Sequence, residues 1–244
     1  MEPTFRPVMT TGAQPTFPGE DRTQDRAVSV EPSRVLRNTY WLLALSLLPT
    51  VAGAALGMSL NFFAFFKAAP IMAPLLMFGV MLGSLFVVTA LRNSVWGVVA
   101  LFGFTFIAGL MLTPILTVAA GFRNGGQLVA LAGGMTSVIF FAMAAVATFS
   151  KRDFSFLGRF LFIGMILVIV ASLANLFFAV PAVSLTISAV AVLIFSLYLL
   201  YDINNIVRGG ETNYVVATLG VFLSLYNIFL SLLNILLALS GQRD

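Results

Sequence analysis

The sequence predicts an all-α integral membrane protein with seven transmembrane helices. Of its 244 residues, 60% are apolar and only 9% are charged, and the mean hydropathy is +1.03. Soluble domains average about 45–50% apolar and about 25% charged residues. A chain with so little polar surface cannot cover a water-soluble globule, so we expect its apolar surface to face the lipid bilayer.

Seven apolar windows are each long enough to cross a bilayer, which takes about 20 apolar residues. In chain order they are residues 40–60, 71–91, 95–119, 127–149, 158–180, 182–201 (or to 208) and 213–239. Short polar connections separate most of them, so consecutive spans run antiparallel and no soluble domain fits between them. The connection at Val180-Pro181 is nearly uncharged. Merging the fifth and sixth windows there would move the C-terminus to the other side of the membrane.

Residues 1–38 differ in composition from the rest of the chain. They hold five prolines and mixed charges with little apolar periodicity. This composition predicts a mostly disordered polar tail, followed by a transmembrane domain over residues 39–244. A secretory signal would place an apolar run at the extreme N-terminus, and none is found there, so we expect the first span to remain in the mature protein.

The distribution of Lys and Arg predicts the orientation, because cytoplasmic loops carry an excess of both. If the N-terminus is cytoplasmic, that side carries nine basic residues besides Arg6: Arg22, Arg26, Arg34, Arg37, Arg92, Lys151, Arg152, Arg159 and Arg208. The other side carries three: Lys67, Arg123 and Arg243. We therefore expect the N-terminus inside and the C-terminus outside. The net charge of +4 is explained by this distribution of basic residues between the two sides of the membrane. We therefore expect no nucleic-acid partner.

Composition also excludes several kinds of catalysis. The chain contains no Cys and no His, which removes thiol nucleophiles, thiolate metal sites and the commonest general base. A Ser-His intramembrane protease would lack its histidine, a two-aspartate protease would lack its second membrane carboxylate, and a retinal protein would lack a lysine in its last span. We expect a protein that is not an enzyme and has no cofactor.

Two glycine pairs predict close helix packing. Gly53 and Gly57 lie in the first span, and Gly79 and Gly83 lie in the second. Small residues four apart let helix backbones approach each other within a membrane.

Asp202 is the only acidic residue inside an apolar window. If the sixth span continues to a C-cap at Gly209-Gly210, Asp202 lies about 10 Å inside that end. An acid costs about 2.5–3.5 kcal/mol at the centre of a span and less towards its ends, which makes it a functional candidate. Shielded from water, it would sense protons near neutral pH.

Arg92, at the same end of the second span, is the expected partner of Asp202. Two alternatives stay open. The sixth span could end near Tyr201 and leave Asp202 in a solvated loop, and Arg92 could be an ordinary positive-inside anchor.

A polar stripe follows one face of the last span. Its members are spaced by three, four and three residues, which places them on one side of a helix: Ser224, Asn227, Ser231 and Asn234. The stripe predicts either hydrogen bonds between helices or the lining of a polar pathway. Ser224 lies within reach of Asp202 if the last span starts near Thr212.

Four segments resemble the Bax inhibitor-1 (transmembrane Bax inhibitor motif) family, in particular its bacterial YccA branch. They are Leu199-Leu200-Tyr201-Asp202-Ile203, the run from Gly209 to Tyr214, the run from Ser224 to Leu233, and the run from Phe104 to Ile115. The similarity covers about 200 residues, from the first span to the end of the chain. It implies seven helices with the last one central, surrounded by the other six, in a bacterial inner membrane.

The resemblance also implies two functions. Family members of known behaviour are pH-sensitive calcium leak channels, in which two aspartates on the sixth and seventh helices form a proton-sensing pair with an arginine from the second. Asp202 matches the first aspartate and Arg92 matches the arginine to within about one position, but Ser224 stands where the second aspartate is expected. Asp202 is then the candidate calcium ligand, with calcium as the permeant ion.

The YccA branch shares this serine and is associated instead with restraining the membrane-anchored AAA protease FtsH. The sequence-based hypotheses are therefore a pH-sensitive cation leak, with modulation of FtsH as the alternative. The tail at residues 1–38 is of the sort that such a protease could grip. The sequence does not predict an oligomeric state.

Overall fold

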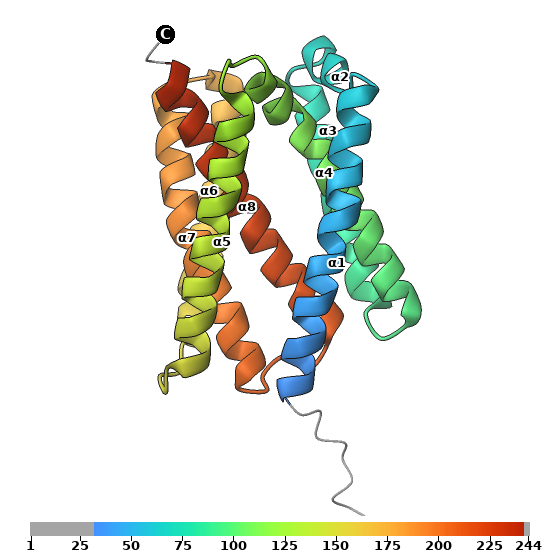
Figure 1. The fold of residues 1–244 in the computed structure, drawn as a ribbon, viewed down its shortest axis with the longest axis vertical. Helices are drawn as coiled ribbons and strands as arrows, with labels where there is room; N and C mark the ends of the chain where they lie inside the picture. Colours follow the sequence, from blue (N-terminus) through green and yellow to red (C-terminus); the bar gives the residue numbers. More distant parts are fainter. Residues whose placement is uncertain (1–31, 242–244) are drawn as a thin grey trace, which may run out of the picture. The chain divides into compact units, whose positions relative to one another are not determined.

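The computed structural model describes residues 32–241, which fold into eight α-helices (Figure 1). These are α1 (Pro32–Ser59), α2 (Phe63–Ala68), α3 (Met72–Leu91), α4 (Val95–Ala120), α5 (Gly125–Phe149), α6 (Leu157–Phe178), α7 (Pro181–Val207) and α8 (Tyr214–Gly241). All except the six-residue α2 are long and apolar enough to cross a membrane. The predicted fold class, an all-α protein with seven spans, is confirmed.

The start of α1 corrects the predicted boundary of the N-terminal tail. The tail was predicted to reach residue 38, but α1 already begins at Pro32. The side chains of Val35 and Thr39 are buried against the bundle, and this packing extends the helix through a polar stretch that apolar windows cannot detect. The rest of the predicted tail, residues 1–31, lies outside the described residues.

The junction between α6 and α7 is a tight turn, so the fifth and sixth windows are separate helices. Ala179 adopts a left-handed conformation with φ of 51°, and Pro181 is the first residue of α7. Proline suits this position because the first helical N–H has no partner within the helix. With seven spans, Pro32 and Gly241 lie at opposite ends of the bundle (Figure 1).

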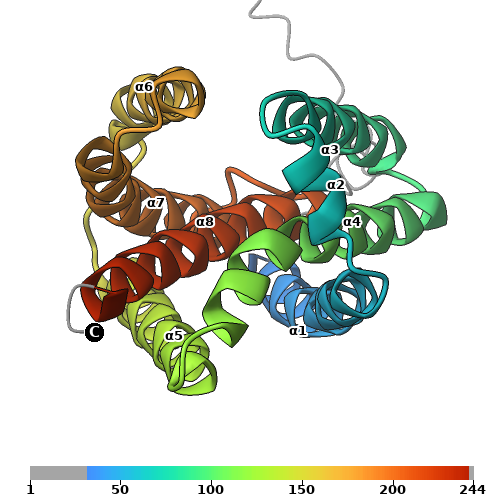
Figure 2. The same ribbon diagram turned by 90° about the horizontal axis from the view of Figure 1, so that it is seen from above.

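The spans form two groups of three that α8 joins (Figure 2). In one group α4 packs against α1 and α3, and in the other α7 packs against α5 and α6. The central helix α8 contacts α7, α5, α1 and α4, with a smaller contact to α3. The last helix is therefore central as predicted, but it is not surrounded by all six others, because α7 lies between α6 and α8 (Figure 2).

Only one of the two glycine pairs mediates helix packing. A Cβ atom on Gly53 would collide with the backbone oxygen of Phe106 in α4, and one on Gly57 would collide with the hydroxyl of Thr113. Nothing lies within 4 Å of a Cβ placed on Gly79 or Gly83 of α3. The prediction of close packing thus holds for α1 and fails for α3, whose glycine face meets no other described helix.

Candidate functional site

Asp202 lies inside α7, about five residues before the helix ends at Val207. The helix stops at Arg208, and Gly209 follows with φ of 76°, a left-handed conformation that glycine adopts readily. The N–H groups of Gly209 and Gly210 donate to the carbonyl groups of Ile206 and Asn205. The structure therefore places Asp202 about 8 Å inside the helix end, so it is not a loop residue.

The carboxyl group of Asp202 faces the central helix. Its Oδ2 atom lies 3.1 Å from the position that a Cβ would take on Gly220 of α8. One turn further along α8, the buried Ser224 side chain lies near the carboxyl group. The absence of a side chain at Gly220 is what lets the carboxyl group fit against α8.

One more charged group lies near this carboxyl group. Glu211, in the connection between α7 and α8, is close enough for its charge to act on Asp202. Glu211 also accepts a hydrogen bond of 2.7 Å from the backbone N–H of Asn213, which fixes its position before α8 begins. The site thus holds two acids and a serine at the junction of α7 and α8.

Arg92 does not pair with Asp202 in this structure. It follows the last residue of α3, its side chain is exposed, and it is not among the groups that act most on the Asp202 carboxyl group. Its backbone oxygen instead accepts a hydrogen bond of 3.0 Å from the side chain of Asn213. The chain therefore brings Arg92 to the start of α8 through its backbone, while its guanidinium group lies in the exposed position typical of a positive-inside anchor.

The far end of the polar stripe joins α8 to α7 by hydrogen bonds. The Asn234 side chain donates to the hydroxyl groups of Ser184, at 3.1 Å, and Ser188, at 2.8 Å. Asn227 bonds only to the Leu223 carbonyl group of its own helix, at 2.8 Å, and Ser231 is buried. Asn234 therefore serves to hold the two helices together, one of the two roles that the sequence left open.

Three residues that support the site were not among the predicted site residues. Gly220 continues the stripe at a spacing of four residues before Ser224, so its position was visible in the sequence. Asn213 accepts hydrogen bonds from the N–H groups of Val215 and Val216 and thereby caps α8. Asn204 is buried in α7, accepts a hydrogen bond from the Phe154 N–H at 3.2 Å, and fixes the connection between α5 and α6.

Metal binding at Asp202 has little support within the described residues. No group of three or more His, Cys, Asp or Glu side chains among residues 32–241 could hold a metal ion. Calcium prefers six to eight oxygen ligands, several of them carboxylates. Asp202 with Glu211 and Ser224 offers fewer oxygen atoms than a tight calcium site needs.

These features define the class: a seven-span bundle whose last helix is central and receives an acid from the preceding span. The chain matches the family described as "Inhibitor of apoptosis-promoting Bax1" over residues 32–242. It belongs to this Bax inhibitor-1 family, as the motifs in its sequence predicted.

Several bacterial proteins are similar to this chain over most of its length. An uncharacterised protein of Neisseria meningitidis serogroup A is 41% identical over 219 residues, which is 88% of this chain and 96% of the relative. "Modulator of FtsH protease YccA" of Escherichia coli K12 is 38% identical over 207 residues, 84% of this chain and 90% of the relative. "Inner membrane protein YccA" of Escherichia coli O6:H1 matches to the same extent.

Proposed function

We propose that this protein is a non-enzymatic modulator of a membrane-anchored AAA protease of the FtsH type, acting in a bacterial inner membrane. The observation that carries the proposal is the 38% identity to the modulator YccA over 84% of the chain. The match spans the whole bundle rather than one helix, which supports a shared mode of action.

The residue content favours an interaction partner over a catalyst. The chain has no His and no Cys, and Asp202 is the one acid within the spans that the structure describes. Exposed apolar residues cover the outside of the bundle, such as Trp41, Phe86 and Leu167. These surfaces suit contact with lipid and with the membrane helices of another protein.

The orientation proposed from the basic residues places the start of α1 in the cytoplasm. Residues 1–31 precede the part of the chain that matches the family. In this orientation they lie on the side where an AAA protease has its ATP-dependent domains, so they are the segment that the protease would engage first.

The test is the turnover of a membrane substrate of an FtsH-type protease in cells that overproduce the chain. We expect a longer substrate half-life and co-purification of the chain with the protease. Removal of residues 2–31 is expected to slow degradation of the chain by the protease. Gly83→Leu, at a position with open space around it, serves as the control and should act like the wild type. Unchanged substrate turnover together with no association would contradict the proposal.

A second function, a pH-sensitive cation leak, is favoured by the position of Asp202 between α7 and α8. Protonation of a carboxyl group in a helix interface changes the charge that the interface has to accommodate. In this proposal a change in the protonation of the carboxyl group, which has Glu211 and Ser224 beside it, changes how the two helices pack and thereby opens or closes the pathway. Arg92, which the family pattern made the partner, is exposed and has no role in this form of the proposal.

Calcium flux into proteoliposomes tests the leak. Asp202→Asn is expected to abolish the pH dependence of the flux, whereas Asp153→Asn, which changes an exposed loop acid, should preserve it. Ser224→Asp restores the second carboxylate of the family pattern and should increase the flux. Wild-type flux no higher than that of empty vesicles at every pH would rule out the leak.

A further inference from the structure

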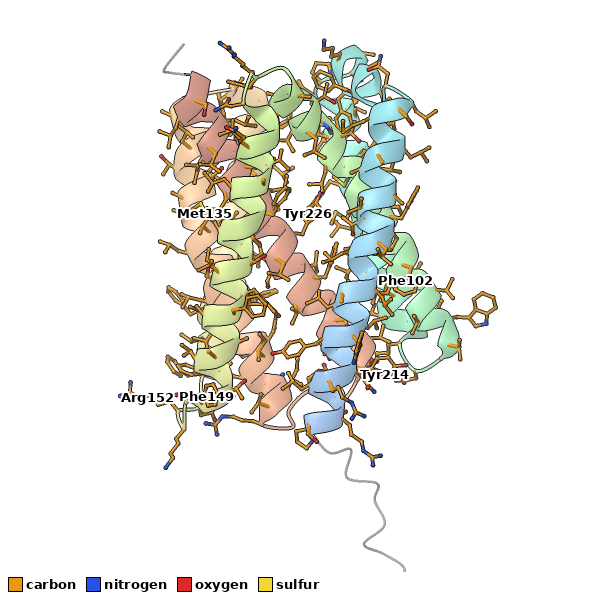
Figure 3. The ribbon with its side chains drawn as sticks, in the orientation of Figure 1. Phe102, Met135, Phe149, Arg152, Tyr214 and Tyr226 are labelled. Carbon is orange, nitrogen blue, oxygen red and sulfur yellow. The ribbon has the colours of Figure 1, made fainter. Side chains whose placement is uncertain are left out.

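An apolar groove opens on the side of the bundle between α1 and α5. It has a volume of about 610 Å³. Tyr40 and Leu47 of α1 form one wall, Gly133 and Phe141 of α5 form the other, and Tyr226 of α8 lies on the floor. Figure 3 shows Tyr226 between these two helices, directed into the space that separates them.

The groove exists because α1 and α5 belong to different halves of the bundle. Each packs against α8, but they do not pack extensively against each other. One ring pair connects them across the groove, Tyr40 with Phe140, whose centroids are 5.8 Å apart at nearly right angles. The central helix is therefore open towards the lipid along this side.

The walls of the groove offer almost no free polar group to a ligand. The Tyr226 hydroxyl donates to the Ala108 carbonyl group at 3.1 Å. The hydroxyl groups of Thr50, Thr136 and Ser137 each donate to a carbonyl group one turn back in their own helix, at 2.8–2.9 Å. Water needs two to four polar partners to remain in a cavity. An apolar occupant therefore fits this groove better than water.

The charge at one end of the groove indicates which apolar molecule fits. Arg37 is exposed and lies three, seven and ten residues before Tyr40, Ala44 and Leu47, so it shares their side of α1. The end of the bundle where α1 begins is basic throughout the described residues. It carries Arg34, Arg37, Arg92, Lys151, Arg152, Arg159 and Arg208, against the loop acids Asp153 and Glu211.

We propose that the groove between α1 and α5 holds one acyl chain of an anionic phospholipid, whose headgroup lies beside Arg37 at the basic end. The groove volume falls within the range of about 300–1,000 Å³ that is typical of small-ligand pockets. A complete membrane-spanning helix, about 30 Å long and at least about 10 Å wide, has several times this volume. The long, flexible side chain of Arg37 reaches the headgroup region while its stem lies on apolar surface.

Adjacent glycines of α5 provide a matched pair of variants. Nothing lies within 4 Å of a Cβ on Gly133 or on Gly134, so either position accepts a side chain without a collision. Only Gly133 lines the groove, whereas Gly134 lies on a different face of α5. Gly133→Leu therefore fills the groove, and Gly134→Leu adds the same side chain elsewhere on the helix. Ala44→Leu fills the groove from the opposite wall, as a second variant should Gly133→Leu fold poorly.

The experiment measures lipid bound to the full chain by native mass spectrometry in detergent, with phosphatidylglycerol and phosphatidylcholine of identical acyl chains. We expect the wild type to retain one phosphatidylglycerol, and Gly133→Leu and Ala44→Leu to weaken this binding about tenfold, the equivalent of about 1.4 kcal/mol. Gly134→Leu should bind like the wild type. Arg37→Gln should remove the preference for the anionic lipid, whereas Arg123→Gln, at the opposite end, should retain it.

Three outcomes would overturn the proposal. Equal weakening by Gly133→Leu and Gly134→Leu in correctly folded protein would show that the lipid binds elsewhere. Equal binding of the two lipids by the wild type would remove the role of the basic end. A wild-type dimer that Gly133→Leu converts to a monomer would assign the groove to a second copy of the chain.

Discussion

The two ends of the interface between α7 and α8 have opposite polar chemistry. At one end the Asn234 amide donates to the hydroxyl groups of Ser184 and Ser188, so neutral groups meet as donor and acceptor. At the other end the Asp202 carboxyl group faces Gly220 and Ser224, with Glu211 nearby. One face of α8 thus meets α7 at both a structural contact and an acid that is costly in a membrane.

This difference shows why a polar stripe alone does not predict a function. A neutral hydrogen bond between membrane helices adds a modest free energy, about 0.6 kcal/mol on average. A carboxylate in a span opposes insertion, so stability alone does not account for its presence. The Asp202 end is therefore the better candidate for function, and the Asn234 end is the better candidate for stabilisation.

The largest expected effect comes from adding a side chain where the Asp202 carboxyl group packs against α8. In Gly220→Leu the new Cβ would lie 3.1 Å from Oδ2 of Asp202, and the rest of the side chain has to push the helices apart. We expect a loss of about 1–3 kcal/mol in the free energy of unfolding, measured by thermal unfolding in detergent. Gly83→Leu on α3 is the control, because nothing lies near it. Similar losses in both variants would mean that Asp202 does not pack on Gly220.

A smaller loss is expected at the opposite end of the interface. Asn234→Ala removes the two hydrogen bonds to Ser184 and Ser188, which should lower the free energy of unfolding by about 1–2 kcal/mol. In Asn227→Ala the lost bond lies within α8, so the effect should be smaller. The same thermal measurement compares the two, and an equal effect would contradict the role of Asn234 between the helices.

Asp202→Asn should leave stability unchanged or increase it. The amide keeps the shape of the side chain and removes the charge, so we expect a gain of up to about 1 kcal/mol, since an acid opposes membrane insertion. Thermal unfolding at neutral pH measures this change. A marked loss of stability would show that the carboxylate stabilises the interface and that its role is structural.

The smallest expected effect concerns the exposed acid Asp153, in the connection between α5 and α6. The Ser155 hydroxyl, at 2.6 Å, and the Ser155 N–H, at 2.9 Å, donate to Asp153 and hold its pKa below its usual range. Because the pKa is lower in the folded state, Asp153 adds stability at neutral pH, and this is lost as the pH falls through the folded pKa. Ser155→Ala should reduce that loss slightly.

Melting temperatures at neutral pH and at about pH 3, below the ordinary Asp pKa of about 3.9, measure this difference. Comparing the melting temperatures of Ser155→Ala with those of Asp202→Asn distinguishes the effect of an exposed acid on stability from that of an acid in a helix interface. An unchanged acid response in Ser155→Ala would show that the hydrogen bonds to Asp153 do not persist in solution.

Most of the fold could be predicted from the sequence because each span is a long apolar window. The windows end within a few residues of the helices, except where packing of Val35 and Thr39 extends α1 into polar sequence. The six-residue α2 was missed because it is far shorter than any membrane window. Packing partners were less predictable: the Gly53 pair contacts α4, but the identically spaced Gly79 pair contacts nothing.

The site was predicted in part. The motif at Asp202 and the spacing of Ser224 placed both residues on facing helices, and the structure brings them together. The similar depth of Asp202 and Arg92 in the membrane could not decide whether the two side chains pair, because an arginine at a helix end can turn towards water as easily as towards the bundle. The space at Gly220 that admits the carboxyl group depends on how α7 packs on α8. The sequence pattern of a single helix does not reveal this packing.

The most direct test of the account is a double-mutant cycle between Asp202→Ala and Ser224→Ala, measured by thermal unfolding in detergent. If the carboxyl group of Asp202 is held against α8 by the Ser224 hydroxyl, the two changes should be coupled by about 0.5 kcal/mol or more. Strictly additive effects would contradict the contact between the two side chains, on which the candidate site depends.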